Sequence, residues 1–200
     1  MMEVKPVTLQ GKVVRLEPLS EAHVPGLTAI GMNDEIWSYM PYGVMRNEDD
    51  IRRWVRNLLE QIPGGTVMPF AVIHLASGRV AGATRYMDIH PKDYAVEIGG
   101  TWYGPEFQRT AVNTECKYLL LRHAFETLGC IRVQIKTDSR NERSQKAIER
   151  IGALREGVLR NHMIMPDGYY RSSVYYSILD DEWPAVKARL EGMMNNGGSR

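Results

Sequence analysis

The sequence predicts a single α/β domain of the α+β kind, with a mixed, mostly antiparallel sheet of about seven strands and helices on both faces. Two observations predict this class. Pairs of β-leaning runs joined by short turns are typical of β-hairpins, and they occur at residues 69–76 with 79–88, and at 158–165 with 169–179. Between the hairpins, the runs 95–102 and 131–136 are each followed by an amphipathic helix. Strands that flank a helix are expected to be parallel neighbours, and a narrow ligand could enter where they splay apart.

The stretch 95–129 is the most informative part of the chain, because a strand, a polar turn and a helix follow one another without a spare residue. Its strand carries Glu97 as the only charged residue. The double glycine Gly99-Gly100 marks a bulge, or a place where another backbone comes close. We therefore expect another chain segment or a ligand to lie against this strand.

An amphipathic helix follows the turn and stops at Gly129. Its apolar residues recur at helical spacing, at Val112, Cys116, Leu119, Leu120, Ala124 and Leu128. Thr110 or Asn113 is the expected N-cap. Free N–H groups at a helix start, with the helix dipole behind them, hold phosphate well, although most helix starts bind no ligand.

Periodicity and stop signals give the remaining elements. They are a strand at 13–18, a helix from Ser20 to about Ile30, a helix at 48–61, a helix opened by Asn141 and ended by Gly152, and a closing helix at 180–190.

Three aromatic residues occupy the irregular segment 37–43, in which Pro41 and Gly43 prevent regular structure. Trp37, Tyr39 and Tyr42 either line a pocket or pin this loop to the core. The residues alone leave both interpretations open.

The bulk composition fits one globular domain spanning residues 1–200, with an ordered core at 4–190 and a tail at 192–200. Of the 200 residues, 44% are hydrophobic, and 25 Lys and Arg balance 24 Asp and Glu. The net charge of +1 gives no electrostatic reason to expect nucleic acid or an anionic membrane as a partner. Cys116 and Cys130 lack metal-ligand spacing, so we expect no metal, reduced thiols and a cytoplasmic protein. No charged start followed by an apolar run opens the sequence, and no stretch approaches the length of a membrane span, so we expect neither secretion nor membrane insertion.

Three motifs, in order and separated by the expected elements, resemble the GNAT superfamily of N-acetyltransferases, within it the branch of ribosomal-protein N-terminal (serine/alanine) acetyltransferases. The likeness covers residues 4–190. The motifs are the turn Glu106-Phe107-Gln108-Arg109-Thr110-Ala111 followed by Asn113-Thr114-Glu115, the run Asn141-Glu142-Arg143-Ser144 through Gly152-Ala153, and Asp180-Asp181-Glu182-Trp183-Pro184. The chain departs from the family pattern at three positions. Glu106 replaces Gln or Arg, Arg109 replaces a glycine, and Ile148 replaces a tyrosine that protonates the leaving thiolate.

The resemblance implies acetyl-coenzyme A as co-substrate, with its pantetheine arm along strand 97–102 and its pyrophosphate on the amides of 109–113. Arg109 could contribute its guanidinium to a phosphate or block the approach, and we favour the first. The implied cofactor-binding residues are Gly100, Thr101, Trp102, Gln108, Arg109, Thr110, Ala111, Val112, Asn113, Asn141 and Ser144.

The implied reaction is direct attack of a primary amine on the thioester, and the amine must be neutral to attack. Glu97 is the candidate general base, and its alternative role is an ion-paired strand residue. A backbone N–H near Ile98 or Gly99 would steady the oxyanion. Ser144 is the candidate to hydrogen-bond the departing sulfur, and its alternative partner is its own backbone.

We expect the acceptor to lie over Trp37, Tyr39 and Tyr42, with the terminal hairpin and its His162 opposite; a polar strand position is the alternative for His162. The acceptor would be an amine-bearing peptide or a protein N-terminus. The alternatives are a small-molecule amine or antibiotic, and a non-catalytic acyl-coenzyme A binding module. A homodimer is only a family expectation.

Overall fold

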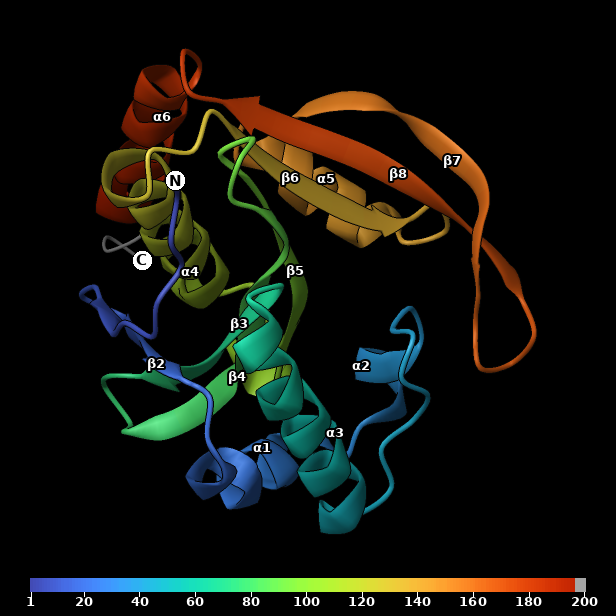
Figure 1. The fold of residues 1–200 in the computed structure, drawn as a ribbon. Helices are drawn as coiled ribbons and strands as arrows, with labels where there is room; N and C mark the ends of the chain where they lie inside the picture. The colour runs from blue at the N-terminus through green and yellow to red at the C-terminus, as the bar shows by residue number, and fades with distance from the viewer. Residues whose placement is uncertain (197–200) are drawn as a thin grey trace.

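The computed structural model describes residues 1–196, which form one mixed sheet with the order β1-β2-β3-β4-β5-β6-β8-β7 (Figure 1). Only the β5–β6 pair is parallel among the described strands, as the sequence predicts. The sheet has eight strands where about seven were expected, because the two-residue β1 adds an edge beside β2. The strands are β1 (Leu9–Gln10), β2 (Val14–Pro18), β3 (Val67–His74), β4 (Arg79–His90), β5 (Ala95–Tyr103), β6 (Arg132–Asp138), β7 (Leu154–Ile164) and β8 (Tyr170–Leu179).

The predicted helices occur in the predicted order, α3 with the predicted bounds, and the short α2 was not predicted. They are α1 (Val24–Gly31), α2 (Asp34–Trp37), α3 (Glu48–Gln61), α4 (Ala111–Arg122), α5 (Glu142–Arg150) and α6 (Trp183–Asn196). Helix α6 starts later than predicted because Glu182 Oε2 accepts a hydrogen bond from the Leu179 N–H at 2.9 Å and closes a turn first. It then continues to Asn196, so the predicted tail is wrong for residues 192–196. The rest of that tail, 197–200, lies outside the described residues.

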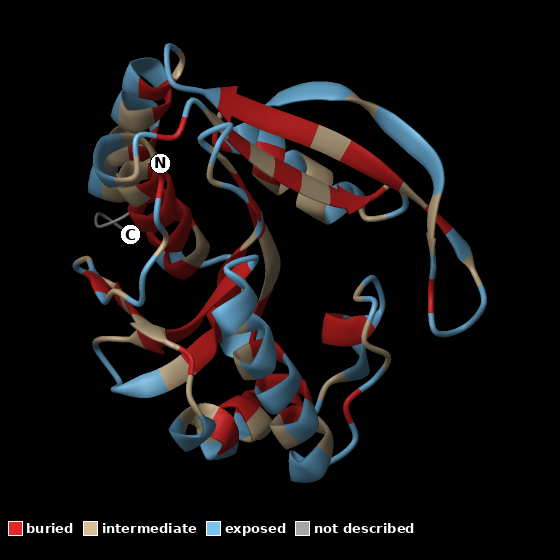
Figure 2. Cartoon of the chain, in the orientation of Figure 1, coloured by how far each residue is buried: buried red, intermediate tan, exposed pale blue. Residues whose placement is uncertain are grey.

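The two faces of the central strands are covered by different helices. Tyr86 of β4 is fully buried, and its hydroxyl donates to the Leu120 carbonyl of α4 at 2.6 Å. The preceding residue, Arg85, points to the other face and donates to the hydroxyl of Tyr42. Helix α1 packs on β4, and α3 packs on α1. Helix α4 packs on α6. Figure 2 shows the resulting buried centre, together with the exposed edge strand β7 beside the buried β8.

A β-bulge interrupts β5 at the double glycine, as predicted. Arg85 of β4 pairs with Gly99 and Ala83 pairs with Trp102, so Gly100 and Thr101 lie opposite a single β4 residue. Gly100 has a φ of +56°, which glycine adopts more readily than other residues. A bulge bends its strand, and this one follows shortly after Glu97, the last β5 residue that pairs with β6.

The parallel strands β5 and β6 separate after a short ladder, as predicted. The ladder has three pairs, the last of which joins Glu97 to Gln134. β5 nevertheless continues to Tyr103 and β6 to Asp138. Beyond Glu97 the facing backbone groups of the two strands are not paired with each other, and this leaves an opening within the sheet.

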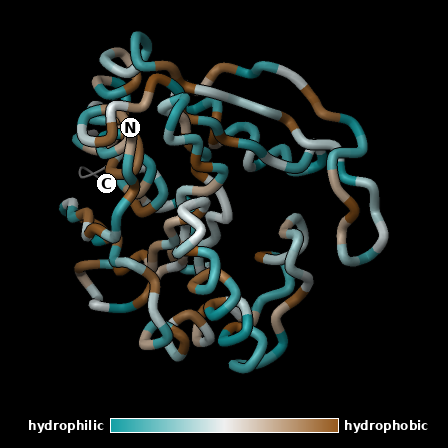
Figure 3. The backbone as a smooth tube through the Cα atoms, viewed as in Figure 1, coloured by the Kyte–Doolittle hydropathy of each residue, from teal (hydrophilic) through white to brown (hydrophobic). Residues whose placement is uncertain are grey.

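Hydrophobic and hydrophilic segments alternate along the whole described chain (Figure 3). Within residues 1–196, every helix is too short or too polar to cross a membrane.

Candidate active site

A cavity of about 580 Å³ opens where β5 and β6 separate, and it reaches from the starts of α4 and α5 to the loop after α2. Most of the residues predicted for the site lie around it. They are Tyr39, Tyr42, Glu97, Gly100, Thr101, Trp102, Gln108, Arg109, Thr110, Asn113, Asn141 and Ser144. The predicted cofactor residues gather at one end, and the aromatic loop forms the other.

Four predicted residues do not line the cavity. The Trp37 side chain is only 2% exposed, its Nε1 donates to the Gly31 carbonyl at 2.7 Å, and its ring packs against Trp102. Trp37 therefore anchors the loop to the core. Ala111 and Val112 are two others. The Val112 N–H donates to the Thr110 cap, so of this pair only the backbone amide of Ala111 could face a ligand.

His162 is the fourth of these residues, and its ring is held inside the terminal hairpin. Its Nδ1 lies 2.9 Å from Ser173 Oγ, and its Nε2 lies 3.1 Å from the Tyr175 hydroxyl. Burial, followed by the charges of Lys136 and Arg171, lowers the pKa of His162. Both ring nitrogens are engaged within β7 and β8, which fits the polar strand position weighed from the sequence.

The start of α4 has the features of an anion site. Thr110 is the N-cap, with Oγ1 accepting from the Val112 N–H at 3.3 Å. The N–H groups of Ala111 and Asn113 belong to the first turn and have no carbonyl partner within the helix. Arg109 precedes the cap with a φ of +58°, in the left-handed region that favours glycine. The arginine thus keeps a backbone conformation typical of the glycine that it replaces, and its side chain lines the cavity. These residues fit a pyrophosphate.

Replacing Arg109 tests whether its guanidinium contacts the ligand. Arg109→Gly should keep or raise the free energy of unfolding, because a non-glycine residue in the left-handed region costs about 1–2 kcal/mol. Coenzyme A should nevertheless bind more weakly, since a charge-assisted hydrogen bond to phosphate is lost. Isothermal titration should show a larger loss for coenzyme A than for pantetheine fragments without the pyrophosphate. An equal loss for both ligands would contradict a phosphate contact.

Helix α5 presents Ser144 to the cavity from its first turn. Asn141 caps this helix, and its Oδ1 accepts from the Ser144 N–H at 3.0 Å. Among the described residues, the Ser144 hydroxyl has no hydrogen-bond partner, which argues against the alternative bond to its own backbone. Arg143, which the sequence reasoning missed although it lies within the second motif, donates to Gln108 Oε1 at 2.9 Å. Gln108 in turn donates to the Tyr103 carbonyl of β5. Through Gln108, the start of α5 is therefore linked to the turn that precedes α4.

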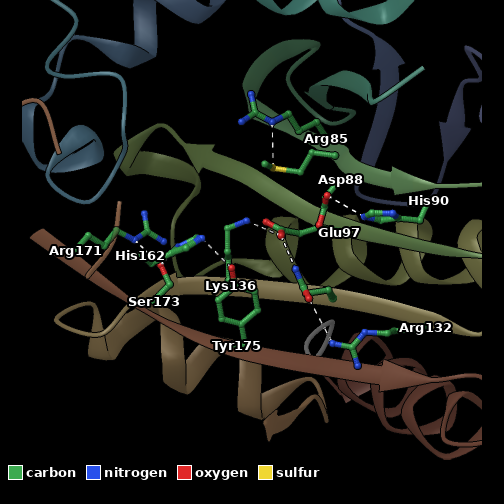
Figure 4. A network of polar contacts seen from close by, with 12 residues as sticks. Arg85, Asp88, His90, Glu97, Arg132, Lys136, His162, Arg171, Ser173 and Tyr175 are labelled. Carbon is green, nitrogen blue, oxygen red and sulfur yellow. Dashed lines mark hydrogen bonds and ion pairs between the residues drawn. The ribbon is translucent and has the colours of Figure 1, made fainter. Parts of the chain in front are cut away.

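Glu97 lies at the last rung of the parallel ladder and is 2% exposed. Its Oε2 accepts from Lys136 Nζ at 2.7 Å and from Gln134 Nε2 at 2.8 Å (Figure 4). The ion pair considered from the sequence is therefore present. Its Oε1 has no hydrogen-bond partner among the described residues and lies 3.0 Å from where a Cβ on Gly99 would be. Because Gly99 has no side chain, this oxygen is not covered from that side.

Lys117 of α4 is a buried cation that the sequence reasoning missed. It is 6% exposed, and its Nζ donates to Thr101 Oγ1 at 2.7 Å at the cavity wall. Burial lowers the pKa of Lys117 to about 8. The sequence feature that could have identified Lys117 is its position next to Cys116, on the apolar side of the helix.

Within residues 1–196, no cluster of three or more histidine, cysteine or acidic side chains is arranged to hold a metal ion.

Comparisons with known proteins agree with this architecture. A family model described as an acetyltransferase (GNAT) domain matches residues 14–154. A Bacillus subtilis (strain 168) protein named "Putative ribosomal N-acetyltransferase YdaF" is 34% identical over 113 residues. That match covers 56% of this chain and 61% of the relative, so the chain spans less than two thirds of the length of YdaF.

Two crystal structures extend the likeness over nearly the whole chain. A protein from T. thermophilus, named a "putative acetyltransferase", is 41% identical with a TM-score of 0.88, covering 96% of this chain and 100% of the other. A GCN5-related N-acetyltransferase from Brucella melitensis is 30% identical with a TM-score of 0.91, covering 96% of this chain and 87% of the other. The family match covers well over half of the sequence, and the chain therefore belongs to the GNAT family of acetyltransferases and is an acyltransferase.

Proposed function

We propose that the protein transfers the acetyl group of acetyl-coenzyme A to the primary amine of a peptide or protein N-terminus. The observation that carries this proposal is the cavity between β5 and β6, with a helix-start anion site at one end and an aromatic loop at the other. The GNAT family uses acetyl-coenzyme A as co-substrate. The relative named a ribosomal N-acetyltransferase supports a protein acceptor.

The residues at the cofactor end suit a long ligand with phosphates at one end. The first-turn amides of α4 and the Arg109 side chain would hold the pyrophosphate. Beyond Glu97, the unpaired edge of β5 would hydrogen-bond an extended amide chain, much as a further strand does. The thioester would then lie near Gly99, close to Glu97 and Ser144, which both line the cavity.

In the proposed reaction the amine nitrogen bonds to the acetyl carbon, and the carbon–sulfur bond breaks. Oε1 of Glu97 would take the amine proton, directly or through a water molecule. The Ser144 hydroxyl would donate a hydrogen bond to the departing sulfur, which takes up a proton to become a thiol. Ile148 is buried one turn after Ser144 and has no proton to give, so Ser144 or solvent would serve this step.

Acetyl-coenzyme A should stabilise the protein and be consumed when a suitable amine is added. A ligand that binds only the folded state at ~100 times its Kd adds about 2.7 kcal/mol to the free energy of unfolding. Thermal melts with acetyl-coenzyme A test binding, and thiol release with a panel of N-terminal peptides and small amines tests turnover. A melting curve that does not respond to millimolar acetyl-coenzyme A would overturn the proposal. Turnover of small amines alone would favour the small-molecule alternative, and binding without turnover would favour the regulatory module.

A further inference from the structure

Two buried arginines line the acceptor end of the cavity. Arg85 of β4 is 9% exposed and Arg171 of β8 is 6% exposed. Figure 4 shows them on different strands, around the pair formed by Glu97 and Lys136. A buried charge is costly unless an opposite charge and hydrogen bonds compensate it, so the partners of these two side chains matter.

The partners of Arg85 are all neutral. Its Nη2 donates to the Tyr42 hydroxyl at 2.6 Å, its Nε lies 3.5 Å from Met87 Sδ, and its guanidinium lies over the Tyr42 ring. These contacts use only part of the donor set of a guanidinium. They place the group at the cavity wall but leave its charge uncompensated.

Arg171 is likewise held by neutral groups. Its Nη1 donates to the Tyr39 carbonyl at 3.2 Å, and its Nε donates to Ser173 Oγ at 3.0 Å. Burial lowers the pKa of Arg171, against the opposing pull of more distant carboxylates.

The buried carboxylates nearby already have cationic partners of their own, and Glu35, which also lines the cavity, is exposed to solvent. Asp138 pairs with Arg140 at 2.9 Å, and Glu97 pairs with Lys136 at 2.7 Å. Within residues 1–196, neither Arg85 nor Arg171 forms an ion pair with a carboxylate. The acceptor end therefore has an excess of buried positive charge.

We propose that Arg85 and Arg171 bind a carboxylate of the acceptor, so that the preferred acceptor is a peptide with an acidic side chain at its first or second residue. This inference rests on the proposed function and names its substrate class. A guanidinium matches the planar, two-oxygen geometry of a carboxylate better than that of any neutral group.

The strand register places this carboxylate away from the reacting amine. Arg85 pairs with Gly99, which lies two residues beyond Glu97 along β5, roughly 6–7 Å at the rise of a strand. Glu97 and the two arginines therefore reach the cavity from different rungs and strands of the sheet, so an acceptor that spans them carries its carboxylate apart from its reacting amine. The same positive charges disfavour a protonated amine, which helps the acceptor to be neutral when it attacks.

The test uses pairs of peptides that differ only by Glu against Gln at the first or second residue. We expect the kcat/KM of the wild-type protein to be about tenfold to a hundredfold higher for the acidic peptide. This is the effect that hydrogen bonds to a charged group usually have on binding. Arg171→Gln and Arg85→Gln should each bring that ratio close to one, mainly by raising KM for the acidic peptide. KM for acetyl-coenzyme A should not change.

Two further variants distinguish loss of the arginine charge from a structural change in the aromatic loop, which Arg171 contacts at Tyr39. Arg171→Lys keeps the charge and should retain part of the acidic preference. Arg56→Gln removes a guanidinium from the outer surface of α3, where it pairs with Glu21, and should leave the ratio unchanged. Thermal melts establish that each variant is folded. Equal kcat/KM values for the two wild-type peptides, or a preference that survives both glutamine variants, would overturn the inference.

The outcomes also separate this inference from the proposed function. If only small amines are acetylated, the peptide proposal fails, and the acid-to-amide ratio is then measured with an amino acid and its amide. If the amino acid is preferred over its amide and this preference requires the arginines, the arginines bind a carboxylate as inferred, and the acceptor is a small amine rather than a peptide. If no amine is acetylated, titration calorimetry with the same peptide pair applies, and equal binding of both peptides would overturn the inference.

Discussion

Glu97→Gln is expected to lower kcat by roughly 10²–10⁴ while binding of acetyl-coenzyme A stays nearly intact, because losing a positioned general base has an effect of this size. Glutamine keeps the shape of the side chain but cannot accept the proton of the amine. Steady-state kinetics over a pH series provides the measurement. If deprotonation is the only task of Glu97, raising the pH should restore the activity of the variant, since the amine then loses its proton to solvent.

The ion pair between Glu97 and Lys136 calls for matched controls. Glu97→Gln leaves the Lys136 ammonium, 15% exposed, without its carboxylate, so stability must be measured alongside kcat. Glu156→Gln removes the carboxylate of a more exposed ion pair, with Arg132 and outside the cavity, and it should change kcat little. Wild-type kcat in Glu97→Gln at neutral pH would remove Glu97 from the chemistry and leave positioning of the two substrates as the source of catalysis.

Lys117→Met is expected to raise the free energy of unfolding at pH 7 by up to about 3 kcal/mol. Folding lowers the pKa of Lys117 from 10.5 to about 8, and each pKa unit corresponds to about 1.36 kcal/mol. Burial makes the charged lysine unfavourable in the folded state, and its hydrogen bond to Thr101 offsets only part of that cost. Methionine has a similar length and carries no charge. Urea unfolding of both proteins, without ligand, measures the difference.

The pH dependence gives the sharper test of Lys117. Between pH 8 and 10.5 the unfolded state binds more protons at this position than the folded state. The stability of the wild type relative to Lys117→Met should therefore rise with pH across this window, and the advantage of the variant should disappear near its upper end. Taking the difference cancels the contribution of Cys130, whose pKa burial raises to about 11. Lys146→Met, at an exposed position of α5, should show no such trend, and a pH-independent difference for Lys117→Met would contradict the burial argument.

Features encoded by neighbouring residues were predictable from the sequence. Helix α3 has its predicted bounds because one face repeats apolar residues between an Asn47 cap and the Pro63-Gly64 stop. Thr110 and Asn141 cap their helices as their residue types suggest. The double glycine forms the predicted bulge, and the strands that flank α4 are parallel and separate.

The order and kind of the elements and the two helix starts that face the cavity could thus be read from the sequence alone, because periodicity, caps and turns depend on residues a few positions apart. The resemblance to the family rested on three short motifs. The pairing of the charges, in contrast, follows from the folded structure: Glu97 contacts Lys136 from the neighbouring strand, Lys117 is buried against Thr101, and Arg171 donates to the Tyr39 carbonyl. The folded structure also places Trp37 in the core rather than at the cavity. These contacts join residues far apart in the chain, and they depend on strand register, on the bulge at Gly100 and on how completely each side chain loses water, none of which a local pattern specifies.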